Sequence, residues 1–354
     1  MHIRVSTAGL IVVTMAAVVF LAAIGNRVLD GDVVNFQFYA DSVTYEKTFR
    51  GDVGNVSSAQ DLVASDRNYL GPLLLLRLVA GNRWGVLALN CLFFAYGVLL
   101  VARIYPLRRP LLVGLLGTCP LLFSSLIAVN KEIFLFLAVC LLMYGLRSRR
   151  FWALGAAAIV GLLARWQAAV FVIVFLSMYS TINPFRERRL LCLILLVTAL
   201  TVVYPSMRVV FAAADQIGAE GALTNEGSGI YSRMIEIQNS YGYFLIVIPK
   251  TLQAIFGPLA KVGQMFPWKD FYNDVMLVWQ AAMTLGLLVA LVVTGRFRLK
   301  NELIYASLVY CVIFALTPVY APRYFFAVYV LWAIALSLPE ETPWERVFMP
   351  RRIA

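Results

Sequence analysis

The sequence predicts an all-α, polytopic membrane protein with about ten transmembrane helices, and three observations support this prediction. First, 61% of the 354 residues are hydrophobic and only 14% are charged, with a mean hydropathy of +0.80, whereas soluble domains are about half apolar and about one quarter charged. Second, the apolar residues form long runs of the kind that a helix needs to cross a hydrocarbon core ~30 Å thick. Third, arginines and lysines gather at one set of run ends, as expected for cytoplasmic loops.

The predicted spans follow the apolar runs in chain order. They are residues 6–25, 84–104, 111–129, 133–146, 151–164, 167–182, 190–205, 275–294, 302–320 and 324–338. The first span follows a basic start and has no clear small-residue cleavage site, which predicts an uncleaved helix rather than a signal peptide. The fifth and sixth spans are short for a complete crossing, so we expect local thinning of the membrane or an indented site there.

The orientation follows from the basic residues. Sixteen of the 30 arginines and lysines lie in short segments that the positive-inside rule assigns to the cytoplasm, namely Arg4; Arg103, Arg108 and Arg109; Arg147, Arg149 and Arg150; Arg186, Arg188 and Arg189; Arg296, Arg298 and Lys300; and Arg346, Arg351 and Arg352. The chain is therefore predicted to form one integral membrane domain, residues 1–354, with both termini and the tail 339–354 in the cytoplasm. Loops 26–83 and 206–274 are then extracytoplasmic.

These two long outer loops contain shorter apolar stretches. Residues 69–81 are interrupted by Arg77, and residues 242–260 contain prolines and Lys250, so both are predicted to lie in the outer interface as helices rather than to span the membrane. The glycine-containing segment "GAEGALTNEGSG", residues 218–229, is predicted to be flexible.

Several classes of function are disfavoured by composition. The net charge of +11 reflects membrane topology and does not indicate a nucleic-acid partner. All five cysteines fall in apolar runs, which predicts small core residues rather than a disulfide framework. The single histidine, His2, lies at the N-terminus, which excludes a histidine base within the membrane and a histidine–cysteine metal cluster.

Charged residues interrupt the apolar sequence at the predicted outer turns. They are Lys131 and Glu132 in "NKE", Arg165 in "LLARWQ", Arg323 in "APRYF" and Lys250, while Asp41, Tyr45 and Glu46 lie in the first loop, in "ADSVTYE". A charge inside a span costs on the order of 2.5–3.5 kcal/mol unless it is paired or hydrated. Each residue alone has a structural alternative, as an interfacial anchor or as a Lys131–Glu132 ion pair. Together they lie on a face where the positive-inside rule does not explain the presence of cations, so they predict a functional site.

The chemistry of these side chains suits a phosphate-bearing lipid. Arginine offers a bidentate fork to phosphate oxygens, and lysine offers a point charge. A nearby carboxylate can take the proton of an acceptor hydroxyl, while the cations stabilise a departing diphosphate. These roles together predict glycosyl transfer from a polyprenyl-linked sugar at the outer face.

At these residues the chain resembles bacterial polytopic proteins of surface-polysaccharide assembly, the Wzy-type and EpsG-type polymerases, and more broadly the type-C membrane glycosyltransferases. The features are "ADSVTYE" after the first span, the "NKE" turn, the long second outer loop and "PRY" before the last span. The resemblance implies an enzyme of the bacterial cytoplasmic membrane that acts on the outer side in cell-envelope polysaccharide synthesis. Its donor and acceptor would be saccharides on undecaprenyl diphosphate or a similar polyprenyl lipid.

The resemblance also implies roles for individual residues. Asp41 takes the catalytic acid–base role, with Asp30, Asp32 and Glu46 as rivals, and Glu132 either orients Lys131 or acts as a second base. Lys131, Arg165, Arg323 and Lys250 hold the lipid phosphate, and Glu46, Tyr45 and Tyr324 contact sugar. The chain departs from larger type-C enzymes in having only a short C-terminal tail and no paired "DE" after its first span.

Other functions remain open from the sequence. A transporter of lipid-linked saccharides also needs inward cations, although repeat symmetry between halves and charges deep in spans would then be expected. A non-catalytic subunit that works with other polysaccharide-assembly proteins is a further alternative, whereas an O-acyltransferase is disfavoured by the lack of a membrane histidine. Polymerisation and single-sugar transfer are not separated. No cofactor is required, and the first-loop carboxylates could hold Mg²⁺ or Mn²⁺, but their spacing is not diagnostic.

Overall fold

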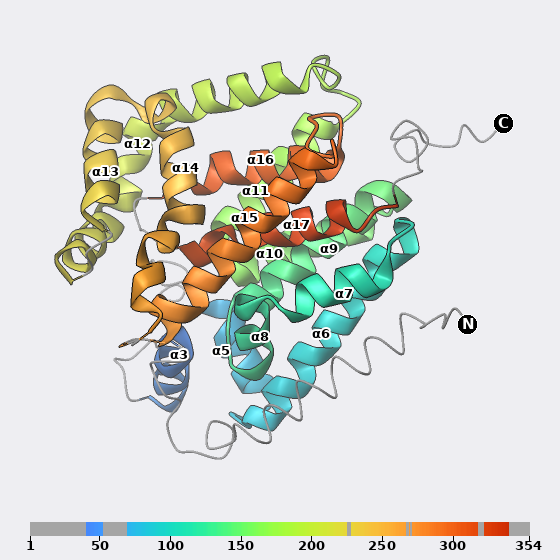
Figure 1. Ribbon diagram of the computed structural model, residues 1–354, viewed down its shortest axis with the longest axis vertical. Coiled ribbons are helices and arrows are strands. Elements are labelled where there is room, and N and C mark those ends of the chain that lie inside the picture. Colours follow the sequence, from blue (N-terminus) through green and yellow to red (C-terminus); the bar gives the residue numbers. More distant parts are fainter. Residues whose placement is uncertain are drawn as a thin grey trace.

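A computed structural model describes residues 40–51, 69–224, 228–266, 269, 271–317 and 322–339, with the backbone alone at 40, 207–224 and 228–232. These residues form helices and no strand (Figure 1), which confirms the all-α prediction. The first half contains α3 (Ala40–Arg50), α5 (Leu70–Leu78), α6 (Arg83–Ile104), α7 (Arg109–Gly117), α8 (Pro120–Ile127), α9 (Glu132–Ser148), α10 (Phe151–Ala164) and α11 (Trp166–Tyr179). The second half contains α12 (Arg189–Thr224), α13 (Ser228–Tyr241), η1 (Tyr243–Leu245), α14 (Val247–Phe256), η2 (Gly257–Gln264), η3 (Phe271–Met276), α15 (Leu277–Val293), α16 (Glu302–Phe314), η4 (Pro322–Phe325) and α17 (Phe326–Leu336).

Among the described residues, three helices are long and apolar enough to cross a membrane. They are α6, the part of α12 from Arg189 to Ser206, and the continuous helix Phe271–Val293 formed by η3 and α15. Helices α10, α11 and α16 are apolar but have only 14, 14 and 13 residues, so each is ~20 Å long against a core ~30 Å thick. The number of crossings stays a prediction, and the span at 6–25 lies outside the described residues.

The third predicted span, residues 111–129, is wrong as a continuous helix. The chain forms α7 and α8 instead, and their axes differ by 73°. Cys119 between them is extended, and Pro120 opens α8. The break has a local cause, because proline lacks an N–H for the preceding turn and disfavours the helical conformation of the residue before it.

Helix α12 also differs from the prediction. It runs beyond the predicted end of the span at residue 205, through Pro205, to Thr224. The part of segment 218–229 that precedes residue 225 is therefore helical rather than flexible. Alanine, glutamine and glutamate are strong helix formers, and their density here outweighs the glycines on which the prediction depended. Helices α13, η1, α14 and η2 then lie within residues 206–274, and the extracytoplasmic, interfacial position of this segment stays a prediction.

The ends of the helices gather into two groups. At one end, Tyr105 after α6 and Tyr179 of α11 both donate hydrogen bonds to Glu302, the first residue of α16. Helices α9 and α17 are almost wholly buried and form the centre of the molecule. Because α9, α10 and α11 follow one another antiparallel, the start of α9 and the α10–α11 turn lie at the opposite end, where Arg165 of the turn contacts Glu132 of α9 and Tyr324 of η4. This is the end that the sequence assigns to the outer face.

Candidate functional site

The turn between α8 and α9 is held by side chains of two other helices. Asn90 of α6 is fully buried and donates to the carbonyls of Ser125, Leu126 and Ala128 at 2.9–3.2 Å. These carbonyls lie at the C-terminal end of α8, where a helix lacks internal donors. Ser42 of α3 donates to the Val129 carbonyl at 2.7 Å, and the Asn130 side chain accepts from the Lys131 amide at 2.8 Å. Lys131 and Glu132 are thereby fixed at the start of α9.

Arg165 forms the whole of the turn between α10 and α11. Its backbone is extended, which ends one helix and allows the next to begin at Trp166. The buried guanidinium lies 3.3 Å from Glu132 Oε1, and its Cζ lies 3.6 Å from the centre of the Tyr324 ring, well within the range of a cation–π contact. The second carboxylate oxygen of Glu132, Oε2, is buried and has no hydrogen-bond partner among the described residues.

Asp41 and Arg323 form the more accessible part of the site. Arg323 Nη2 lies 2.9 Å from Asp41 Oδ2, and the side chains are 19% and 26% exposed, compared with 6% and 2% for Arg165 and Glu132. Tyr45, one turn along α3, donates to the same oxygen of Asp41 at 3.2 Å. The Nε of Arg323 is buried without a hydrogen-bond partner in the described part of the chain. The Asp41–Arg323 pair thus lies at the more exposed side of the site, which we call its mouth. The Arg165–Glu132 pair lies at the buried side, which we call its floor.

Lys131 is a buried residue that interacts electrostatically with the charged side chains of both pairs. The residue is 6% exposed, and its Nζ lies 5.5 Å and 5.9 Å from the ring centres of Tyr45 and Tyr69. These two rings pack edge to face, with their centres 5.3 Å apart. Tyr69 precedes α5, which packs on α10 so closely that a Cβ on Gly71 would lie 2.3 Å from the Leu163 carbonyl oxygen.

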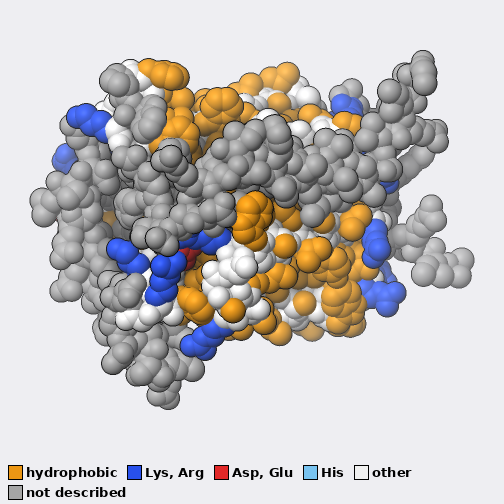
Figure 2. All heavy atoms as spheres, turned by 90° about the horizontal axis from the view of Figure 1, so that it is seen from below, with side chains coloured by type: hydrophobic (Ala, Val, Ile, Leu, Met, Phe, Trp, Pro, Cys, Tyr) orange, Lys and Arg blue, Asp and Glu red, His pale blue; other side chains and the backbone are white. Residues whose placement is uncertain are grey.

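We call Asp41, Lys131, Glu132, Arg165 and Arg323, with Tyr45 and Tyr324, the outer charged cluster. Counted over the described residues alone, it combines three cations with two carboxylates, which gives a net charge of +1 when all five groups are ionised. In a view from below Figure 1, basic side chains gather beside a small acidic patch, and hydrophobic side chains cover most of the remaining described surface (Figure 2). A buried site with excess positive charge favours an anionic ligand.

The pKa values of Asp41 and Lys131 are both lower than those of the free side chains. Burial acts to raise the pKa of Asp41, but the nearby charges of Arg323, Lys131 and Arg165 prevail and leave that pKa below its ordinary value. Burial, together with the charge of Arg165, lowers the pKa of Lys131 to about 7. At neutral pH Asp41 is therefore ionised, while Lys131 exchanges readily between its ammonium and amine forms.

The structure therefore brings together seven of the nine predicted site residues and separates two. Glu46 is buried and forms a bidentate pair with Arg83 of α6, at 2.9 and 2.6 Å, which is a bracing contact between α3 and α6. Lys250 is fully buried in α14 and donates to Gln238 of α13 at 2.8 Å, so we do not include it in the cluster. Asp30 and Asp32 lie outside the described residues. Sequence analysis missed Tyr69, which belongs to no motif that would mark it.

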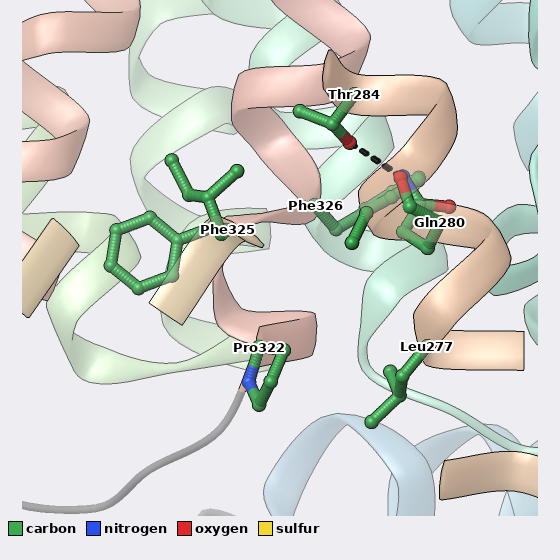
Figure 3. Close-up of a pocket in the computed structure, with 8 residues that line it drawn as sticks. Leu277, Gln280, Thr284, Pro322, Phe325 and Phe326 are labelled. Carbon is green, nitrogen blue, oxygen red and sulfur yellow. Dashed lines mark hydrogen bonds between the residues drawn. The ribbon is translucent and has the colours of Figure 1, made fainter. Parts of the chain in front are cut away.

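A narrow apolar pocket begins next to the cluster, at the residue before Arg323. It is lined by Ile255, Leu277, Gln280, Ala281, Thr284, Pro322, Phe325 and Phe326, which come from α14, α15, η4 and α17 (Figure 3). The polar side chains in the wall are engaged with each other or with Cys119, since Gln280 donates to Thr284 and accepts from the Cys119 thiol. The pocket therefore offers an apolar surface beside a charged one.

No protein-family model, curated protein sequence or solved structure matches the chain. The part of the chain that the structure describes contains no group of three or more histidine, cysteine, aspartate or glutamate side chains arranged to hold a metal ion. All five cysteines are buried and free. The function must therefore be inferred from the geometry of the outer charged cluster itself.

Proposed function

We propose that this protein is a membrane glycosyltransferase that acts on polyprenyl (di)phosphate-linked saccharides at the extracytoplasmic face, as a polymerase of bacterial surface polysaccharide. One observation carries the proposal. Charged residues from four segments far apart in the sequence, which interrupt apolar stretches or lie in the first loop, converge in one buried cluster. Three of these five ionisable groups, Lys131, Glu132 and Arg165, are buried, which is costly, and a pair of isolated braces would not require three cations at one place.

The cations suit a phosphate or diphosphate. Arg165 and Arg323 each engage a carboxylate through one terminal nitrogen. Other guanidinium donors can then serve a ligand, including the Nε of Arg323, which has no hydrogen-bond partner among the described residues. When the bond between the sugar and the lipid diphosphate breaks, negative charge develops on the diphosphate. Preorganised arginines in a water-poor site stabilise that charge strongly.

The carboxylates suit the acceptor hydroxyl. Glu132 Oε2 is a buried acceptor without a partner among the described residues, so a hydroxyl placed there would satisfy it and be oriented by it. Asp41 at the mouth is ionised at neutral pH and is the candidate acid–base group that the resemblance suggests. Tyr45 and Tyr324 border the same space, with their rings beside Lys131 and Arg165 respectively.

The surroundings suit a lipid substrate. The apolar side chains of Pro322, Phe325 and Leu277 next to Arg323 form an apolar surface against which an isoprenoid chain could pack when its phosphate lies in the cluster (Figure 3). Helices α10 and α11 are ~9 Å shorter than the hydrocarbon core, so the Arg165 turn would lie below the outer membrane surface. On the surface of α14, Ile248 and Leu252 are exposed, as expected for a helix in contact with lipid.

The test uses the protein in nanodiscs with a lipid-linked oligosaccharide as donor and acceptor, and with products separated on a gel. Wild type should give a ladder, and Asp41→Asn, Arg165→Ala and Arg323→Ala should lose it while inserting normally. Arg186→Ala, which removes an exposed arginine paired only with Glu187, is the matched control and should keep full activity. A single shifted band would indicate single-sugar transfer, and equal activity in all variants would reject the site.

A further inference from the structure

Arg323 holds Asp41 through an incomplete contact. A guanidinium has an edge, formed by Nε and Nη2, that can donate two parallel hydrogen bonds to a carboxylate or a phosphate. In the Asp41–Arg323 pair only Nη2 is used, at 2.9 Å from Asp41 Oδ2. The Nε of the same edge is buried and has no hydrogen-bond partner among the described residues. A buried donor without an acceptor is uncommon in a folded protein and indicates a group that is missing.

A second ion pair of α3 shows the complete form of this contact. Arg83 donates from Nε to Glu46 Oε1 at 2.9 Å and from Nη2 to Glu46 Oε2 at 2.6 Å, so both donors of its edge are satisfied. Its side chains are 9% and 10% exposed, compared with 19% and 26% for Arg323 and Asp41. The Glu46–Arg83 pair is therefore a closed brace, whereas the Asp41–Arg323 pair leaves one donor unused at the more accessible mouth of the site.

The other neighbours of Arg323 do not complete its edge. Besides Asp41, its electrostatic partners are Tyr272 of η3, Glu132 of α9 and Tyr324. None of them accepts a hydrogen bond from Nε in the part of the chain that the structure describes. A ligand with two oxygens on one atom, such as a phosphate, would satisfy both Nε and Nη2 at once.

We propose that Arg323 exchanges partners when the donor binds, because a (di)phosphate of the lipid-linked saccharide takes both Nε and Nη2 and displaces Asp41. This inference rests on the proposed function and adds a control of its acid–base group. Without a donor, Asp41 Oδ2 accepts from both Arg323 and Tyr45, and a guanidinium beside a carboxylate weakens it as a base. After the exchange, Asp41 is free to take the proton of the acceptor hydroxyl.

The step that follows the exchange balances. The acceptor O–H bond breaks, its proton moves to Asp41 Oδ2, and the acceptor oxygen forms a bond with the anomeric carbon of the donor sugar. The bond between that carbon and the phosphate oxygen breaks, and its electron pair stays on the departing (di)phosphate, whose growing charge Arg323 stabilises through two hydrogen bonds. Asp41 thus becomes an effective base only when a donor is already in place.

The first test measures the affinity for inorganic pyrophosphate in nanodiscs by titration calorimetry, without turnover. If Asp41 competes with the anion for Arg323, Asp41→Asn should bind pyrophosphate at least ~10-fold more tightly than wild type. Arg323→Lys keeps the charge but lacks the two-donor edge, so its affinity should be ~10-fold lower than that of wild type. Glu187→Gln, which removes an exposed carboxylate paired with Arg186, is the matched control and should bind like wild type.

A double-mutant cycle separates competition from a general effect of charge. In an Arg323→Ala background there is no guanidinium to compete for, so the gain from Asp41→Asn should be at least ~5-fold smaller than in the presence of Arg323. An equal gain in both backgrounds would show that Asp41 merely repels the anion, and it would overturn the proposal. A lower affinity in folded Asp41→Asn, as expected of a simple brace for Arg323, would overturn it too.

The source of the anion is tested by displacement of the bound pyrophosphate. Farnesyl diphosphate, a short polyprenyl diphosphate, should displace it at a lower concentration than a short-chain phosphatidic acid does. The reverse order would assign Arg323 to a phospholipid headgroup of the membrane and would contradict the exchange with a donor.

Turnover of a lipid-linked donor separates this inference from the proposed function. Asp41→Asn should bind the anion more tightly and yet lose turnover, a combination that a bracing role does not produce. If wild type forms product but Asp41→Asn binds pyrophosphate no more tightly than wild type, the exchange is rejected, and the proposed function stands. If wild type forms no product, the proposed function is rejected, and this inference fails with it.

Discussion

Asn90 allows a quantitative test of how the fold positions the site. Its amide carries two N–H groups and reaches three carbonyls at the end of α8, so two good hydrogen bonds are available at one time. Asn90→Ala removes both and leaves two buried carbonyls without donors, at ~1–3 kcal/mol each. We expect the free energy of unfolding to fall by about 2–6 kcal/mol. Because the same turn carries Lys131, transferase activity should fall too.

The assay is equilibrium unfolding in mixed micelles, followed by intrinsic tryptophan fluorescence, with activity measured on the same preparations. Asn90→Leu fills the side-chain volume but offers no donor, so a similar loss identifies hydrogen bonds rather than a cavity as the cause. Asn301→Ala, which removes the N-cap of α16 at the opposite end, should cost about 1 kcal/mol without lowering the activity of the folded protein. An Asn90→Ala variant within about 0.5 kcal/mol of wild type would refute the reasoning.

Three further predictions concern the surroundings of the cluster. Gly71→Ala should separate α5 from α10, because the new Cβ would lie 2.3 Å from the Leu163 carbonyl oxygen, and thermal unfolding should occur at a lower temperature than for wild type. Glu46→Gln should destabilise by about 3 kcal/mol, because the buried Arg83 loses its carboxylate, whereas Glu46→Leu combined with Arg83→Met should recover most of that loss. Lost activity in the well-folded double variant would show that the pair does more than brace. Finally, the lowered pKa of Lys131 means that the unfolded chain binds more protons than the folded one above about pH 7. Stability should therefore rise from pH 7 to 9 in wild type, and the rise should be smaller in Lys131→Met, as measured by unfolding at each pH.

The sequence contained strong signals for the floor of the site. Lys131, Glu132 and Arg165 stand in long apolar runs, where a charge is expensive, so their convergence could be anticipated from cost alone. Arg323 was identified in the same way, as a charge within apolar and aromatic sequence, and Asp41 was identified by its place in the first loop. Because the short helices α9, α10 and α11 run antiparallel in succession, the start of α9 and the α10–α11 turn lie at the same end of the molecule.

Other features depend on contacts that one-dimensional patterns do not contain. Glu46 resembles any loop carboxylate until α3 packs on α6 and places it against Arg83. Lys250 resembles the cluster cations, but the fold directs it to Gln238. Asn90 is an ordinary polar residue in an apolar helix until the end of α8 meets it. The α7–α8 break, by contrast, had a local signal in Pro120.

The most direct test of the central claim follows one fluorescent lipid-linked oligosaccharide in proteoliposomes that contain the protein. Product formation and movement of the labelled lipid between leaflets are measured in the same preparation. Our account predicts saccharide chains extended on the lipid, with release of polyprenyl diphosphate, and loss of both in Arg165→Ala and Arg323→Ala. Labelled lipid that crosses the bilayer through the protein without any new saccharide product would contradict the enzyme and favour a transporter.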